Sequence, residues 1–141
     1  IDTVSLLLLL ATAPVGLLNG SPTPQEVGKH ISYEARKQDA DVLLSMAIAY
    51  SESGFRNVCN KKYGCRGGIG VFQIVQSTFR AFKCEGQPKN PADNIACGVR
   101  ILVEGGHYHW EPSMLGKNGW YPLYTRLVLE QSRRKLAALD L

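Results

Sequence analysis

The sequence predicts a mainly α-helical single domain with little or no β structure. Apolar residues recur at helical spacing in several segments, and residues that commonly start and stop helices bound those segments. No segment alternates apolar and polar residues as a half-buried strand does. The 141 residues suffice for one domain with tails and a sizeable core, and the 45% hydrophobic and 20% charged content excludes a disordered chain.

Residues 1–24 are predicted to be an apolar export segment followed by a linker. Leu6 to Leu10 are consecutive leucines, and the apolar stretch continues to Leu18. Its length of about 15 residues is short for a membrane-crossing helix, which needs about 20, and fits the apolar region of a secretory signal. Ala11-Thr12-Ala13 has the small-x-small form of a cleavage site, although Pro14 is a poor context for cleavage. A retained membrane anchor is the alternative, and either interpretation places the protein outside the cytoplasm.

An amphipathic helix is expected over residues 25–37, directly after the linker. Its apolar positions recur every four residues, so they share one face. They are Val27, Ile31 and Ala35.

The second helix is expected to be buried on all sides and to form the centre of the domain. From Val42 to Ala49 it is apolar on nearly every face, and Asp39 or Asp41 can cap its start. The sequence then becomes polar, so Glu52 lies where a buried helix ends. Partial desolvation there would raise the pKa of the carboxyl group, as in an acid that protonates a leaving oxygen in a glycosidase.

The four cysteines favour an exported protein with two disulfides. Four cysteines allow three connectivities, and proximity in the sequence favours Cys59–Cys65 and Cys84–Cys97. The alternative is a zinc site with His107 and His109 as further ligands, but the sequence has no Cys-x-x-Cys pair. We therefore expect no metal and no cofactor.

Residues 57–70 are rich in glycine and predict a constrained loop that can include a small hairpin. A short helix is expected over 76–83, burying Phe79 and Phe82. The next helix has a clear start, with Asn90 as cap and Pro91 at the first position. Gly105-Gly106 ends it, and a last amphipathic segment follows over 122–139. The buried stripe of the capped helix is predicted to be Ile95, Val99, Leu102 and Val103.

An ordered set of motifs runs from residue 42 to residue 102. It consists of Ser51-Glu52-Ser53-Gly54-Phe55, then Gly67 to Ile74, then Thr78, then Asn94-Ile95 and Gly98. This set resembles the soluble lytic transglycosylase (SLT) family, which is similar to goose-type lysozymes. The resemblance implies a lysozyme-like domain over 25–113, a C-terminal extension over 114–141, and peptidoglycan as the substrate.

The resemblance also implies a mechanism with one carboxylate. Glu52 would act as acid and base in cleaving the β-1,4 bond between N-acetylmuramic acid and N-acetylglucosamine, leaving 1,6-anhydromuramoyl ends without consuming water. A lysozyme-like muramidase that hydrolyses the same bond is the alternative, with Asp93 or Glu111 as a second carboxylate. A non-catalytic wall-binding module is the rival from another class.

Four residues near Glu52 are candidate substrate-binding residues. Gln73 matches the glutamine of the family's Gly-Leu-Met-Gln motif, and the resemblance implies that it hydrogen-bonds a sugar N-acetyl group. Ser53 either orients the substrate or carboxylate or caps the helix. Gly70 would let the backbone approach a sugar, and Phe72 would form an apolar wall or belong to the core.

The segment from Gly106 to Ser113 departs from the family pattern. Many relatives have an Ala-Tyr-Asn-Ala-Gly segment there, whose tyrosine reaches the catalytic glutamate. Tyr108 or Trp110 would take over that role or stack on a sugar ring; the alternative is that they close the core.

The net charge of +4 is modest. A basic rim would attract anionic wall polymers, and a solvated surface is the equal alternative. No groove-reading motif indicates nucleic acid, and we expect a monomer. The basic residues that would form this rim follow Glu52 or lie near the C-terminus: Arg56, Lys61, Lys62, Arg66, Arg126, Arg133, Arg134 and Lys135.

Overall fold

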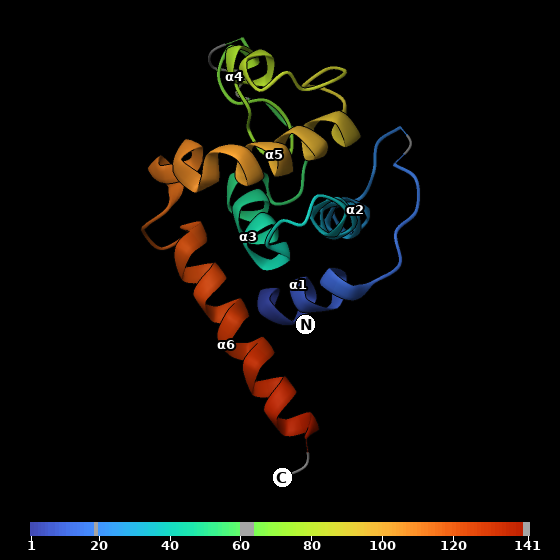
Figure 1. Ribbon diagram of the computed structural model, residues 1–141, viewed down its shortest axis with the longest axis vertical. Helices are drawn as coiled ribbons and strands as arrows, with labels where there is room; N and C mark the ends of the chain where they lie inside the picture. Colours follow the sequence, from blue (N-terminus) through green and yellow to red (C-terminus); the bar gives the residue numbers. More distant parts are fainter. Residues whose placement is uncertain (19, 60–63, 140–141) are drawn as a thin grey trace.

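The computed structural model describes residues 1–18, 20–59 and 64–139 (Figure 1). The chain is 63% helical and contains no strand in its described part, which confirms the predicted mainly α class. In the predicted loop, isolated antiparallel bridges join Ile69 to Cys59 and to Ile74, and residues 60–63 lie outside the described residues. The elements are α1 (Thr3–Thr12), α2 (Pro24–Lys37), α3 (Val42–Ser53), α4 (Gln76–Ala81), α5 (Pro91–Gly105), the 3-10 helix η2 (Gly106–Ser113) and α6 (Trp120–Ala138).

Helix α3 is the centre of the molecule, as its apolar sequence predicts. The side chains from Met46 to Ala49 are fully buried, and α3 contacts α1, α2, α5, η2 and α6 (Figure 1). Asp41 provides the N-cap, because its carboxylate accepts a hydrogen bond of 3.0 Å from the Leu44 N–H. Gly54 ends the helix in the left-handed conformation with φ 64°. The C-terminal turn that carries Glu52 therefore has a fixed position.

Helix α5 starts as predicted at the Asn90 cap, but its buried face differs in part. Ile95 and Val99 are buried, whereas Val103 is 52% exposed and Ile101 is buried instead. The buried face is centred on Gly98, where an added Cβ would overlap the ring of Phe72. This close approach turns Val103 outward, so its predicted burial was wrong.

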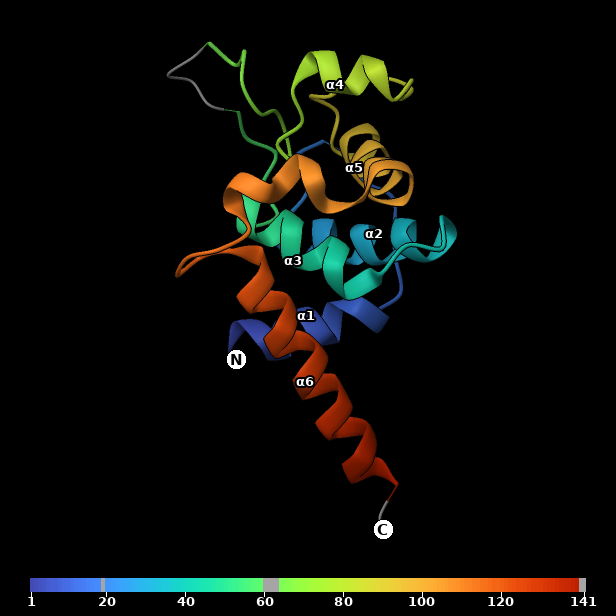
Figure 2. The same ribbon diagram turned by 60° about the vertical axis from the view of Figure 1, so that its left-hand side comes forward.

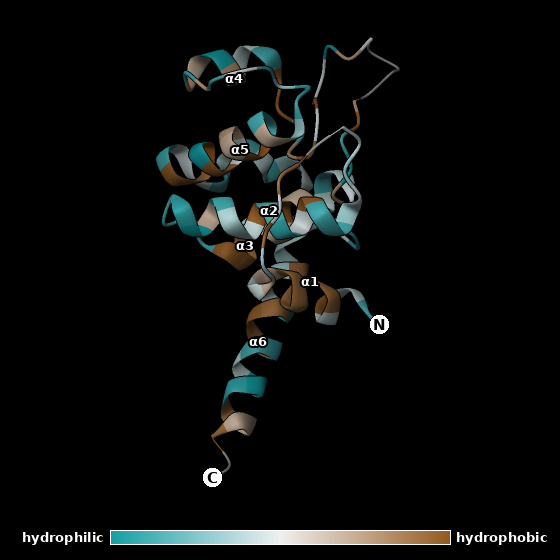
Figure 3. Ribbon diagram, turned by 90° about the vertical axis from the view of Figure 1, so that its right-hand side faces the viewer, coloured by the Kyte–Doolittle hydropathy of each residue, from teal (hydrophilic) through white to brown (hydrophobic). Residues whose placement is uncertain are grey.

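The N-terminal apolar segment forms helix α1, which packs into the core against α2, α3 and α6. Figure 3 shows α1 as the most continuously hydrophobic helix of the view. Leu10 lies over Gly28, where a Cβ would come within 2.7 Å of its Cδ1 atom. The Ala11 carbonyl accepts hydrogen bonds from the Ser32 hydroxyl and, at 2.6 Å, from the Arg36 guanidinium. The buried α1 side chains are Leu7, Leu8, Leu10 and Ala11.

Within the described ranges, no helix combines the length and the apolar character needed to cross a membrane. The interpretation of residues 1–24 as a signal or anchor stays a prediction, as do the predicted domain boundaries.

Helix α6 packs against the body with its first half and projects beyond it with its second (Figures 1 and 2). It begins two residues earlier than predicted. Trp120, Leu123 and Leu127 are buried, whereas Leu129 and Leu136 are 64% and 65% exposed. The start of the predicted extension is therefore part of the same core as α3.

Both disulfides favoured by sequence proximity are present. Cys59 is bonded to Cys65 and Cys84 to Cys97, with Cα atoms 5.2 and 5.4 Å apart. The second bond ties the segment after α4 to α5. Phe79 is buried as predicted, and Phe82, which caps α4, is half-buried.

Candidate active site

Glu52 is half-buried in the last turn of α3. Desolvation raises the pKa of its carboxyl group above the ordinary value of 4.5. The Ser113 hydroxyl donates a hydrogen bond to Oε1, which opposes this rise to a smaller extent. The result is a carboxyl group that keeps its proton to a higher pH than a solvated glutamate and has one defined polar partner.

Ser113 is the last residue of η2, at the end of the segment that departs from the family pattern. Its Oγ also lies 3.1 Å from the Trp110 carbonyl, which provides a second acceptor. Five residues later, the Asn118 carbonyl accepts a hydrogen bond of 2.8 Å from the Ser51 hydroxyl. The connection between η2 and α6 is therefore attached to α3 at two consecutive positions, Ser51 and Glu52.

The loop from Ile69 to Ile74 is held by Asn94, which is fully buried on α5. The Asn94 side chain accepts from the Phe72 N–H and donates to the carbonyls of Ile69 and Pro88, each at 2.8 Å. Gly70 has φ 78°, and a Cβ there would overlap the Asn94 amide. A glycine is therefore required at this position for packing.

Ser53 and Gln73 also fasten this loop. The Ser53 hydroxyl donates to the Val71 carbonyl at 2.7 Å, which connects the end of α3 to the loop. The Gln73 amide nitrogen donates to the carbonyls of Val58 at 2.9 Å and Gly70 at 2.8 Å. Both side chains thus have positioning roles whether or not they contact a substrate.

Phe72 and Trp110 lie in the core and leave little surface for a ligand. Phe72 is 0% and Trp110 4% exposed, with ring centroids 5.9 Å apart. The Trp110 indole donates to the Phe72 carbonyl at 2.9 Å, and the Trp120 indole donates to the Trp110 carbonyl at 2.8 Å. Tyr108, in contrast, is 67% exposed beside His107.

Asp93 and Glu111, the candidate second carboxylates, do not share the surroundings of Glu52. Asp93 accepts a hydrogen bond of 2.9 Å from the Gln87 N–H at the start of α5. Glu111 is exposed on η2. In the part of the chain that the structure describes, neither hydrogen-bonds to Glu52. Lys61 and Lys62 of the predicted basic rim lie outside the described residues.

Among the described residues, no group of three or more histidine, cysteine, aspartate or glutamate side chains is arranged to hold a metal ion. The four cysteines are all paired in disulfides.

The family model of the transglycosylase SLT domain matches residues 29–107, which is more than half of the chain. The chain belongs to the transglycosylase SLT domain family. No curated protein and no solved structure matches the chain. Membership confirms the family predicted from the motifs, and at family level it assigns a lytic transglycosylase-type action on peptidoglycan.

The SLT match includes Glu52 and the Asn94-anchored loop but ends before Ser113. Sequence reasoning missed Ser113 as the partner of Glu52 and looked instead to Tyr108 and Trp110. A single serine at the end of an atypical segment carries no distinguishing signal, because the contact joins residues 61 positions apart. Only the path of η2 across the end of α3 reveals it.

Proposed function

We propose that this SLT protein is a lytic transglycosylase in which Glu52 acts first as acid and then as base. The observation that carries the proposal is the half-buried Glu52 carboxyl group, whose pKa is raised by desolvation and whose defined partner is the Ser113 hydroxyl. A carboxyl group that holds its proton near neutral pH is what protonation of a glycosidic oxygen requires.

In the first step, Glu52 donates its proton to the bridging oxygen as the bond to the muramic acid anomeric carbon breaks. N-acetylglucosamine leaves with that proton, and positive charge develops at the anomeric carbon. The Glu52 carboxylate then removes the proton from the 6-hydroxyl of the same muramic acid. The 6-oxygen bonds to the anomeric carbon, which closes the 1,6-anhydro ring and restores protonated Glu52 without water.

Ser113 serves this cycle by holding one carboxyl oxygen. Its hydroxyl donates to the ionised form, so it stabilises the carboxylate present between the two steps, while desolvation favours the protonated form at the start. The two effects act on the pKa in opposite directions, and desolvation is the larger, so the pKa of Glu52 is raised.

The neighbouring loop provides the contacts to the sugar. Both Gln73 amide protons point to backbone carbonyls, so the side-chain oxygen is the atom that can accept a hydrogen bond from a sugar N-acetyl N–H. Gly70 and Ser53 hold the backbone of this loop next to the end of α3. Tyr108 is the exposed aromatic ring of η2 that can stack on a sugar.

The disulfides support action in an oxidising compartment outside the cytoplasm, where the wall polymer lies.

The test is mass spectrometry of muropeptides released from purified peptidoglycan by the native protein and by Glu52→Gln. Anhydro ends from the native protein alone are expected. Glu111→Gln is the matched control, because it makes the same change at an exposed acid on η2 and should release the same products as the native protein.

Other results would contradict the proposal in distinct ways. Reducing ends, together with loss of activity in Glu111→Gln, would show a two-carboxylate hydrolase. Co-sedimentation with the wall but no release of any fragment would show a binding module.

A further inference from the structure

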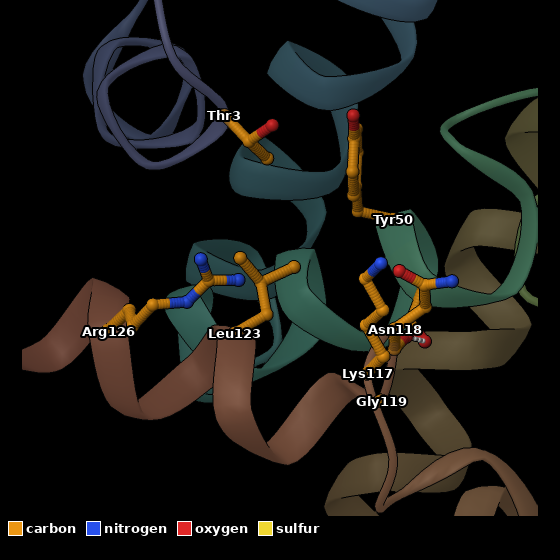
Figure 4. A pocket seen from close by; sticks show the side chains of 8 residues that line it. Thr3, Tyr50, Lys117, Asn118, Gly119, Leu123 and Arg126 are labelled. Atoms are coloured by element: carbon orange, nitrogen blue, oxygen red, sulfur yellow. Dashed lines mark hydrogen bonds between the residues drawn. The ribbon is translucent and has the colours of Figure 1, made fainter.

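A cavity of about 470 Å³ opens beside the C-terminal turn of α3. Figure 4 shows that it lies between this turn, the connection from η2 to α6, the first turns of α6 and the start of α1. Its lining residues are Thr3, Tyr50, Ser51, Lys117, Asn118, Gly119, Leu123 and Arg126. Apart from Tyr50 and Ser51, they lie outside residues 29–107, so the cavity is built by parts of the chain that the SLT match does not include.

The cavity adjoins Glu52 through the connection between η2 and α6. Ser51, which lines the cavity, directly precedes Glu52 and donates a hydrogen bond to the Asn118 carbonyl. Ser113, at the other end of the same connection, donates to Glu52. Consecutive Cα atoms are about 3.8 Å apart, and an extended peptide spans about 3.3–3.6 Å per residue. A substituent of one or two residues on a sugar at Glu52 spans about 3–7 Å, and the cavity wall begins at Ser51, the residue directly before Glu52.

The cavity is cationic. Lys117 and Arg126 line it, no acidic residue does, and Figure 4 shows both cationic side chains directed into the space between α1, α3 and α6. Among the described residues, neither forms an ion pair. The nearby acid of α6, Glu130, is paired with Arg133 at 2.6 Å and with Arg134 at 3.1 Å. Two cations that line one polar cavity without an acidic partner among the described residues indicate a site for an anion.

We infer that this cavity binds a carboxylate of the short peptide that peptidoglycan carries on muramic acid. The inference rests on the proposed function, because it takes the glycan at Glu52 as given. The Arg126 guanidinium can bind a carboxylate in a bidentate manner, and the Lys117 ammonium adds a second charge. Tyr50 and Ser51 form the part of the wall that directly precedes Glu52 in the chain, and the Ser51 hydroxyl is already donated to the Asn118 carbonyl. The cavity thereby distinguishes peptide-bearing strands from bare glycan.

The kinetic test compares two substrates and two double variants. Lys117→Gln/Arg126→Gln neutralises the cavity, and Arg80→Gln/Lys135→Gln makes the same change in net charge at exposed positions on α4 and the far end of α6. On peptidoglycan with its peptides, the first variant should release anhydro products about three- to tenfold more slowly, since exposed charge pairs contribute modestly. On glycan stripped of its peptides, all three proteins should be equal. Equal slowing on both substrates, or none on either, would overturn the inference.

A binding measurement separates this inference from the proposed function. Amide chemical shifts of Ser51 and Asn118 in the full chain are followed while a soluble muramoyl peptide is added, either with free carboxylates or with the carboxylates amidated. Shifts with the free form alone, lost in Lys117→Gln/Arg126→Gln, would support the cavity even for a protein that cleaves nothing. Equal shifts with the amidated peptide, or with inorganic phosphate at the same concentration, would overturn the assignment to a peptide carboxylate.

Discussion

Replacing Asn94 with alanine should strongly destabilise the protein. The side chain is fully buried and makes three hydrogen bonds of 2.8 Å to the backbone of Ile69, Phe72 and Pro88. Asn94→Ala leaves one N–H and two carbonyl groups without these partners.

The magnitude follows from two of these groups, the Phe72 N–H and the Pro88 carbonyl, because the Ile69 carbonyl keeps a hydrogen bond of 2.9 Å from the Ile74 N–H. Each buried polar group left without a partner costs about 1–3 kcal/mol, and a water entering the space vacated by the amide can satisfy some of them. We therefore expect the free energy of unfolding to fall by about 2–4 kcal/mol. A domain of this kind is typically stable by only about 5–15 kcal/mol, so the loss is a large share of the total.

Asn57→Ala is the matched control. Asn57 is exposed and donates one hydrogen bond of 2.9 Å to the Lys89 carbonyl, so its loss should cost about 0.5 kcal/mol or less. Urea unfolding with the disulfides intact measures both, and Asn94→Ala should lower the midpoint by about 2 M. Similar midpoints for the two variants would refute the view that Asn94 holds the loop onto α5.

Four further outcomes are expected. Ser113→Ala removes a hydrogen bond to the ionised Glu52 carboxyl group, so its pKa rises further, and the alkaline limb of the pH–rate profile for anhydro product release should move to higher pH; an unmoved limb would count against Ser113 as the partner. Because the folded-state pKa of Glu52 lies above the ordinary 4.5, the folded protein binds more protons than the unfolded one. The protonated Glu52 therefore contributes to the free energy of unfolding, and this contribution is fully present below about pH 4.5 and is lost as the pH rises through the folded-state pKa. Measured at several pH values, the free energy of unfolding of Glu52→Gln should therefore increase relative to that of the native protein as the pH rises. If both proteins show the same pH dependence, the pKa of Glu52 is not raised. Gly98→Ala places a Cβ against the Phe72 ring and should cost about 1–3 kcal/mol in urea unfolding, despite the better helix propensity of alanine; a stabilised variant would show that the ring can move aside. Replacing Cys84 and Cys97 together with serine opens a loop with a sequence separation of 13 and should lower the free energy of unfolding by about 3 kcal/mol, whereas an unchanged value would mean that the bond adds no constraint.

The helices were predictable because their signals are local. The Asn90–Pro91 start of α5 and the apolar run of α3 each lie within one segment, and the structure places both helices accordingly. The position of Glu52 followed from the same run, since a helix buried on all sides must present its first polar residues where it ends.

The placement of α1 could not be predicted from its composition. A stretch of leucines gains from leaving water whether its new surroundings are lipid or protein, so the sequence alone does not select between a membrane and the face formed by Gly28 and Phe55. Only the fit of Leu10 over Gly28 and the hydrogen bonds to the Ala11 carbonyl distinguish the packed arrangement.

The burial of the two aromatic residues of η2 could not be predicted from the sequence either. Tyr108 and Trp110 are two residues apart in η2, yet one is 67% and the other 4% exposed. Their difference arises from tertiary contacts, chiefly those of Trp110 with Phe72 and Trp120.

Helix α1 can pack into the core, or it can be bound by an export machinery or by lipid, but not both at once. Leucines that fill the core cannot at the same time be held by an export machinery or by lipid, so export of this chain through residues 6–18 requires that α1 has not yet docked. In a chain that folds before transport, the leucines of α1 are buried and the Ala11 carbonyl is hydrogen-bonded to Ser32 and Arg36, so the export machinery cannot bind them. Removal of the segment after translocation would leave Gly28 and Phe55 facing water. If the predicted signal in residues 1–24 is cleaved, the protein loses α1 and keeps five of the six α-helices of its described part.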